Sequence, residues 1–202
     1  MVQRDLAQGK KNAEMRKATV IFVDESGFDL SPHVCRTWAP VGHTPVLKFP
    51  LRRGRISAIS GVTLDDRVYF RMCRSAVKGH DVAVFLRQLL RCIEGPIVLV
   101  WDGIPIHRAR EVLLEIDAAN DRLEVHRLPA YAPELNPDEY LWNWLKNKKL
   151  VNRAFNTLDD LVVGLRKAIR AVRFSPDLIQ SFYEATPLSK PNKKKIPKLC
   201  AG

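Results

Sequence analysis

Short apolar runs that alternate with segments of helical periodicity constrain the fold of this chain more than any other feature. The runs ATVIFV at 18–23 and IVLVW at 97–101 are rich in β-branched residues and bounded by polar or turn residues, which is typical of buried strands. Similar patterns predict strands over 56–62, 67–73 and 123–128. Three strands followed by alternating helices and strands indicate an α/β domain built on a mixed sheet.

Helices are expected between and after these strands, where large apolar residues recur at steps of three and four. They are predicted over 81–93 and 106–118, from Asn136-Pro137, over 158–172, and from Ser175-Pro176. Proline suits the first position of a helix, which supports the starts at Pro137 and Pro176. Prolines and glycines interrupt 27–54, so we expect that stretch to be mostly loop.

Positive charge is concentrated at the two ends of the chain. The chain carries 33 Lys and Arg against 22 Asp and Glu, a formal net charge of +11. Residues 1–17 carry +3 and residues 189–202 carry +5, which leaves +3 for residues 18–188. We therefore expect a basic linker or helix over 1–17, a folded domain over 18–188 and a basic flexible tail over 189–202. A chain this basic fits polyanionic partners such as nucleic acid.

Several other protein classes do not fit the sequence. No apolar run approaches the roughly 18 residues that a membrane span needs, and the N-terminus lacks the hydrophobic core of a signal peptide. The four cysteines are scattered without a CxxC pair, and His33, Cys35 and His43 have no fourth metal ligand at suitable spacing. A cytoplasmic location is therefore expected. Neither GxxxxGK[ST] nor GxGxxG occurs, which argues against nucleotide-binding folds.

Basic residues inside the predicted domain also form clusters. One cluster includes Arg52, Arg53 and Arg55, and a second begins at Lys146. Each is a candidate contact for DNA phosphates, although a solvated charged face explains a single cluster equally well. Trp38 precedes the first cluster and is more simply a packing residue than a base-stacking one.

Acidic residues stand where predicted elements begin or end. Asp24, with Glu25 beside it, follows the first strand, Asp102 follows IVLVW, and Glu139 lies in the first turn of the helix from Pro137. Strand alternation places Asp24 and Glu25 on opposite faces of the sheet. Carboxylates from neighbouring strand ends and an adjoining helix supply the shared oxygen ligands that two divalent cations about 4 Å apart require. The pattern therefore predicts a two-metal site.

Each acid also has a purely structural interpretation. Glu139 stands at the third helical position after Asn136 and could close a capping box with it. Asp102-Gly103 is a common turn pair, and Asp24 could cap a loop. Only the occurrence of acids on three separate elements favours the metal site.

The helix from Pro137 is expected to be amphipathic. Its predicted buried stripe consists of Tyr140, Leu141, Trp144 and Leu145. Glu139 and Lys146 then share another face, so that a base able to hold a DNA phosphate stands beside a carboxylate. An ordinary exposed face is the alternative that the pattern equally allows.

Four motifs occur in a fixed order along the chain. They are VDESGF (23–28), W-x-P-x-G-x-x-P (Trp38 to Pro45), LVWDGIPIHRA (99–109) and LPAYAPELNPDEYLW (128–142). Together they closely resemble the catalytic domain of DDE-type transposases, in the bacterial insertion-sequence group related to mariner elements. The resemblance spans about 18–188. Gly103 is a mild departure, since many relatives have Asn after the second Asp.

The resemblance implies a ribonuclease-H-like fold, in which helices flank a five-stranded mixed sheet whose first three strands are antiparallel. It implies that Asp24, Asp102 and Glu139 bind two Mg²⁺ or Mn²⁺ ions, and the 36 residues between Asp102 and Glu139 suit the family. The implied activity is phosphodiester hydrolysis at element ends, followed by attack of the freed 3′-hydroxyl on target DNA. His107 matches a recurrent family histidine. His107 and Asn136 are both candidates to support the site or to contact DNA. The alternative for His107 is an ordinary packed or surface histidine.

Full-length relatives carry N-terminal helix-turn-helix modules, for which the 17 residues before the first strand leave no room. We therefore expect either a partner polypeptide that supplies this region or a truncated copy. DNA is the expected partner, bound weakly and with strong salt dependence by this chain alone, and a homo-oligomer on DNA is expected by analogy. The rival interpretations are a structure-selective nuclease of the same fold, an inactive transposase remnant and a non-catalytic DNA-binding protein.

Overall fold

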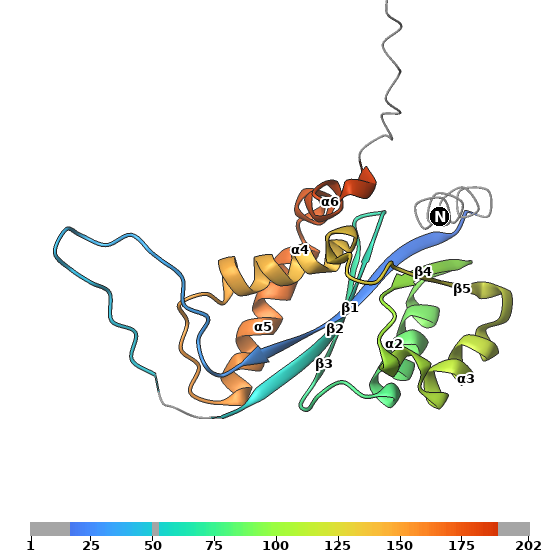
Figure 1. Ribbon diagram of the computed structural model, residues 1–202, viewed down its shortest axis with the longest axis horizontal. Helices are drawn as coiled ribbons and strands as arrows, with labels where there is room; N and C mark the ends of the chain where they lie inside the picture. The colour runs from blue at the N-terminus through green and yellow to red at the C-terminus, as the bar shows by residue number, and fades with distance from the viewer. Residues whose placement is uncertain (1–16, 50–52, 190–202) are drawn as a thin grey trace, which may run out of the picture.

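A five-stranded mixed sheet forms the centre of the structure (Figure 1). The computed structural model describes residues 17–49 and 53–189, so most of the predicted N-terminal linker and C-terminal tail lie outside it. The strands are β1 (Thr19–Asp29), β2 (Arg55–Thr63), β3 (Val68–Cys73), β4 (Ile97–Trp101) and β5 (Leu123–Arg127). Their order is β3-β2-β1-β4-β5, with β1, β2 and β3 antiparallel to one another and β4 and β5 parallel to β1. The predicted mixed sheet is confirmed.

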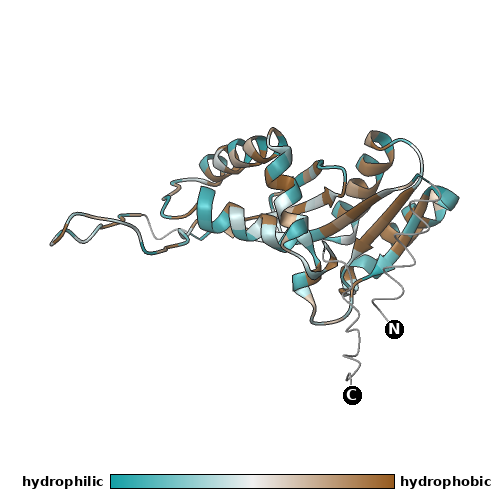
Figure 2. Cartoon of the chain, turned by 90° about the horizontal axis from the view of Figure 1, so that it is seen from above, coloured by the Kyte–Doolittle hydropathy of each residue, from teal (hydrophilic) through white to brown (hydrophobic). Residues whose placement is uncertain are grey.

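Helices cover both faces of this sheet (Figure 1). They are α2 (Gly79–Cys92), α3 (Arg110–Ala119), α4 (Pro137–Trp144), α5 (Leu158–Arg173) and α6 (Pro176–Glu184). Apolar residues of α2 and α3 pack with Ile21 and Val23 of β1, while α4, α5 and α6 pack with Phe28 of the same strand and with β2. Figure 2 shows the strands as strongly hydrophobic and the helices as mixed in character. Among the described residues, no helix has the length and apolar character needed to cross a membrane.

The first strand is longer than predicted. β1 continues to Asp29 because residues 25–29 pair with 59–55 of β2, although their side chains do not form an apolar run. Asp24 and Glu25 consequently lie in the middle of β1, and the prediction that they end the first strand is wrong. What ends near them is β4, the parallel neighbour of β1.

Two further predictions also differ from the structure. The segment 106–118 is not one helix but a 3₁₀ turn, η1 (Pro105–Arg108), followed by α3, because Ala109 between them is extended (φ −60°, ψ 145°). The described residues between β1 and β2, 30–49 and 53–54, form a loop, as predicted for most of 27–54, and residues 30–49 project from the body of the protein (Figures 1 and 2). Trp38 lies on this loop with its side chain fully exposed, so its predicted role in packing is wrong.

Helix α5 shows how the α4–α6 side of the core is held together. Thr157 and Asp160 form a reciprocal capping box at its start, and apolar residues at helical spacing then face the sheet. Leu165 is completely buried in this stripe, whereas Val163, two positions earlier, is 63% exposed.

We therefore expect Leu165→Ala to lower the free energy of unfolding by about 2–5 kcal/mol, since it leaves a cavity in the core. The matched variant Val163→Ala, on the exposed side of the same helix, should change it by no more than about 0.5 kcal/mol. Denaturant unfolding of both proteins measures the difference. Equal losses in the two variants would show that α5 does not pack against the sheet through this stripe.

Candidate active site

Parallel pairing brings Asp24 and Asp102 to one place. Phe22 of β1 is the register partner of Val100 of β4, and two residues farther along each strand come Asp24 and Asp102. Val20, Phe22, Val98 and Val100 share one core, so alternation turns Asp24 toward that side of the sheet. Asp102 lies one residue beyond the end of β4, and its Oδ1 lies 3.3 Å from His107 Nδ1. Because β4 ends at Trp101, β1 has no neighbour on this edge beyond that point. Asp24 and Asp102 therefore occupy neighbouring positions where β4 ends, but the carboxylate of Asp102 lies closest to Glu25 and His107, whereas the charges that act on Asp24 are those of Glu25 and Glu139.

Helix α4 is attached to β1 on either side of its first turn. The indole Nε1 of Trp142 donates a hydrogen bond to Asp24 Oδ2 (2.9 Å), and the Asn136 side chain donates to the carbonyl oxygen of Val23 (3.3 Å). Both Trp142 and Asn136 are buried. These bonds hold the start of α4, which carries Glu139, next to the acidic part of β1.

The N-terminus of α4 is capped without Glu139. Asn136 accepts a hydrogen bond from the backbone N–H of Asp138 (3.1 Å), and no reciprocal bond from the Glu139 side chain accompanies it. The capping box that the sequence allowed is therefore not formed. The Glu139 side chain is exposed, and its charge acts on Asp24. This leaves the Glu139 carboxylate free to bind a ligand beside Asp24.

The buried stripe of α4 differs in part from the predicted one. Leu141, Trp142 and Leu145 are buried, whereas Tyr140 and Trp144 are only partly so. Trp142 packs against Phe28 and Phe70 with its ring while its N–H reaches Asp24. Trp142 is therefore a core residue outside the predicted stripe, and its bond to Asp24 was not anticipated.

His107 links the two strands from the other side of the sheet. Its side chain is buried, with Nε2 lying 3.0 Å from Glu25 Oε1 and Nδ1 lying 3.0 Å from the Asp102 carbonyl oxygen and 3.3 Å from Asp102 Oδ1. The imidazole also stacks on Trp101, with ring centroids 4.0 Å apart. The turn η1 aims His107 inward, so it is a packed residue that also orients the acids.

Opposing effects set the protonation of His107. Burial lowers its pKa, but the hydrogen bond and negative charge of Glu25, together with Asp102, outweigh burial and raise the pKa above its usual value. A protonated His107 donates to Glu25 through one nitrogen and to Asp102 through the other. It thereby holds the backbone of the Asp102 turn against β1.

Carboxylates crowd together in this region without enough positive charge to balance them. Burial, and then repulsion from Glu25 and Glu139, raises the pKa of Asp24 to about 7, although the Trp142 bond acts in the opposite direction. Asp138 is completely buried, and burial raises its pKa well above the usual value, even though Ser60 donates a hydrogen bond to it. Such crowding favours the binding of a cation.

The donor set fits a hard divalent metal ion. Carboxylate oxygens are the ligands that Mg²⁺ and Mn²⁺ prefer. Among the described residues, Glu25 Oε2 and Asp138 Oδ2 are buried without a hydrogen-bond partner. Ligand atoms of Glu25, Asp102 and His107 also lie within 4.8 Å of one another, in the only group of potential metal ligands found in the described part of the chain. His107 already uses both nitrogens, so we assign it to orienting the acids.

Sequence reasoning missed the roles of Glu25 and Asp138. Glu25 was placed on the face opposite Asp24, which is correct, but nothing in the sequence located His107 on that same face. Asp138 directly precedes Glu139 and so points elsewhere on α4, toward Ser60 of β2. Helical spacing could have shown that it faces the sheet, but only the fold shows what it meets there.

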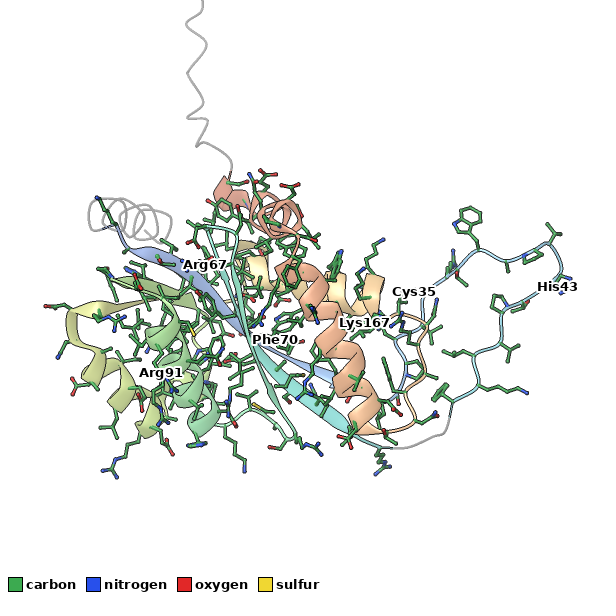
Figure 3. All side chains as sticks on the ribbon, turned by 180° about the vertical axis from the view of Figure 1, so that it is seen from behind. Cys35, His43, Arg67, Phe70, Arg91 and Lys167 are labelled. Carbon is green, nitrogen blue, oxygen red and sulfur yellow. The ribbon has the colours of Figure 1, made fainter. Side chains whose placement is uncertain are left out.

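The predicted basic residues lie beyond the end of the acidic cluster, and Arg55 alone among those described also lines a smaller cavity with Glu25. Arg53, Arg55 and Lys146 line a separate cavity, which Glu139 does not line, and Arg52 lies outside the described residues. Lys146 belongs to the π-helical turn η4 (Leu145–Lys149) that follows α4, and its Nζ lies 5.5 Å from the Phe28 ring centroid. Lys146 therefore turns toward Phe28. Figure 3 shows His43 far out on the loop from Cys35, in agreement with the prediction that they bind no metal together.

Comparison with solved structures identifies similar folds in the Mos1 mariner transposase. The Mos1 strand transfer complex has a TM-score of 0.61 and 16% identity, covering 91% of this chain and 58% of the Mos1 chain. A Mos1 paired-end complex with Mg has a TM-score of 0.62 and 18% identity, covering 90% and 60%. The Mos1 catalytic domain has a TM-score of 0.57 and 15% identity, covering 91% and 89%. The chain thus spans about three fifths of the Mos1 chains in the complexes and shares the ribonuclease-H-like fold of the catalytic domain.

Sequence comparisons point to the same family. No curated protein matches the sequence. Residues 19–162 match a family model described as DDE superfamily endonuclease, a segment that contains Asp24, Asp102 and Glu139. Because this match covers well over half of the chain, the protein belongs to the DDE superfamily of endonucleases.

Proposed function

We propose that this chain is the catalytic domain of a transposase, which cleaves DNA strands at the ends of an insertion sequence and joins them to target DNA. The observation that carries the proposal is the placement of Asp24 on β1 next to the end of β4, which Asp102 follows, together with the bond from Trp142 that holds α4 and Glu139 beside Asp24. Membership of the DDE endonuclease family supports it. The solved Mos1 structures described as strand transfer and paired-end complexes support DNA ends and target DNA as substrates.

Asp24, Asp102 and Glu139 are proposed to hold two Mg²⁺ or Mn²⁺ ions, and Mos1 structures described with Mn and with Mg support that choice. When bound, such a pair of ions activates the attacking oxygen and stabilises the leaving one. The protein's own part is to position the ligands. Trp142 and Asn136 fix α4 against β1, so that Glu139 is presented beside Asp24.

The Glu25–His107 pair is proposed to position Asp102 rather than to contact DNA. The imidazole is 2% exposed and is held between Trp101, Glu25 and the Asp102 backbone. A group so enclosed cannot reach a substrate, but it restricts the turn that carries Asp102. Holding a catalytic carboxylate in place in this way raises the reaction rate by a large factor, because small displacements of reacting groups slow the reaction strongly.

The assembly around the chain is also part of the proposal. We infer that the chain acts as a homo-oligomer on DNA, together with a helix-turn-helix polypeptide that recognises the element ends; Mos1 structures described as a paired-end complex and as a transpososome support an assembly on DNA. An inactive remnant or a non-catalytic DNA-binding protein would have no need for the carboxylates. Metal-dependent cleavage therefore separates these alternatives.

Glu139→Gln and Asp102→Ala should each lower Mg²⁺- or Mn²⁺-dependent nicking of DNA by at least about a hundredfold, since bound metal stabilises the reaction by several kcal/mol. Binding of DNA should be retained. Glu134→Gln, a change to an exposed acid just before α4, is the matched control and should nick normally. Undiminished nicking by Glu139→Gln, or no nicking by the wild type even with a helix-turn-helix partner, would refute the catalytic role.

Without metal, the free energy of unfolding should fall as the pH rises from about 4 to about 7. The pKa of Asp24 is raised from 3.8 to about 7 in the folded protein, so its contribution is full below the unfolded pKa and is lost as the pH rises through the folded one. Each unit of difference corresponds to about 1.4 kcal/mol. The raised pKa of His107 acts in the same direction.

Denaturant unfolding in EDTA at a series of pH values measures this dependence, which Asp24→Asn should flatten. Addition of Mn²⁺ at pH 7 should restore stability to the wild type and much less to Asp102→Asn, because binding to the folded state stabilises it. An equal Mn²⁺ effect in Asp102→Asn would place the metal elsewhere.

A further inference from the structure

A second site lies beyond the carboxylates at the end of the sheet, where residues from both faces of β1 line a cavity. It is a cavity of about 1080 Å³ between the end of β1, the start of β2, η4 and α5. Four cationic side chains line it, those of Arg53, Arg55, Lys146 and Arg153. Asp29 is the only acid among its lining residues, and its carboxylate lies 4.0 Å from the Arg55 Nε with both groups largely exposed. Because this ion pair is long and exposed to solvent, Asp29 neutralises little of the positive charge of Arg55, and the cavity remains strongly positive.

The position of Arg55 depends on a glycine. A Cβ atom at Gly27 would lie 2.0 Å from Arg55 Nη2, so the guanidinium occupies the space above Gly27 that any other residue would fill. Gly27 and Arg55 also line a smaller cavity of about 380 Å³ that contains Glu25. The two cavities therefore adjoin at Gly27, and the positive surface extends to within two residues of the acidic part of β1.

Two rigid elements connect the carboxylates with the basic cavity. Along β1, Phe28 of the cavity is four residues beyond Asp24, a distance of about 13 Å. Along α4 and its extension, Lys146 is seven residues beyond Glu139, about 10 Å. A DNA strand advances roughly 3.4 Å per nucleotide along the duplex axis, so either path corresponds to about three or four nucleotides.

We propose that the cavity lined by Arg53, Arg55, Lys146 and Arg153 binds the sugar-phosphate backbone of DNA about three to four nucleotides from the bond held at the carboxylates. This inference rests on the proposed function for the identity of its ligand. Arginine forks match the geometry of phosphate oxygens, and three of the four cations are arginines. A backbone bound here would fix which linkage reaches Asp24, Asp102 and Glu139.

Salt-dependent binding of the full chain to a fluorescent DNA duplex, measured by anisotropy in EDTA, tests the proposal without requiring cleavage. The variants are Arg53→Ala, Arg153→Ala and Lys146→Met, the last of which keeps an apolar stem over Phe28. Arg91→Ala is the matched control, because Arg91 is exposed on α2, on the opposite side of the sheet (Figure 3). Thermal melting of each variant confirms that it is folded.

Each cavity variant should bind several-fold more weakly than the wild type on any DNA sequence. The slope of log affinity against log salt should fall in magnitude by about 0.9 for each lost phosphate contact. Arg91→Ala should leave both unchanged. If the salt slopes of DNA binding by Arg53→Ala and Arg153→Ala equal the slope of Arg91→Ala, the inference is overturned. An acidic protein segment would then be the favoured occupant of the cavity.

The outcomes also separate this inference from the proposed catalytic function. If the salt dependence of DNA binding falls in the cavity variants but the wild type shows no metal-dependent nicking, the DNA-binding cavity is supported and the catalytic function is rejected. If the wild type nicks DNA in a metal-dependent way but the cavity variants bind DNA as well as Arg91→Ala does, the catalytic function is supported and the DNA-binding cavity is rejected. Glu139→Gln should keep the full salt slope, since its carboxylate takes no part in the cavity.

Discussion

The parallel pairing of β1 with β4 is the constraint on which the site depends. Four pairs of residues, from Thr19 with Ile97 to Phe22 with Val100, set the register, and β4 then stops while β1 continues in its pairing with β2. The place where one strand ends beside another that continues is where Asp24, Glu25 and Asp102 collect. A slip of one residue in this register would exchange the faces of Asp24 and Glu25 and would turn the apolar residues of β1 away from their core partners.

The acids come together against their mutual repulsion, and the surrounding residues compensate. Trp142 and Ser60 donate hydrogen bonds to the carboxylates of Asp24 and Asp138, and the imidazole of His107 lies between Glu25 and Asp102. Burial, and after it the repulsion from neighbouring acids, raises the pKa values of Asp24 and Asp138 above their usual range. A site with this excess of negative charge is stabilised most by a multivalent cation, which is also the agent that phosphodiester chemistry requires.

Much of the fold could be predicted from the sequence because its strands are apolar runs with clear boundaries. IVLVW becomes β4 residue for residue, since a strand buried on both faces is a continuous apolar segment, here between Pro96 and Asp102. The second half of β1 was missed because SGFD contains few apolar residues and is held by pairing with β2, a contact far away in sequence. The break at Ala109 was missed because the helical pattern continues through it.

The sequence predicted the acidic residues of the candidate site but not the residues that hold these acids in place. Asp24, Asp102 and Glu139 were expected from their positions at strand and helix boundaries and from the resemblance to DDE-type transposases, and they remain predictions as metal ligands. The bonds of Trp142 to Asp24 and of His107 to Glu25 join residues more than 80 positions apart. Local sequence patterns carry no information on such distant pairs. A tryptophan at helical spacing, for example, predicts only a core residue and not its hydrogen-bond partner.

Helix α4 and its π-helical extension form a single stiff element with a different chemical group at each end. Glu139 stands at one end and Lys146 at the other, while Trp142, between them, is bonded to Asp24. The wider π-helical turn changes the angle at which Lys146 leaves the axis relative to a regular α-helix. Removing one residue from η4 would rotate the basic end by a large fraction of a turn while leaving the acidic end in place. The length and twist of this element together set the distance and direction of Lys146 from Glu139.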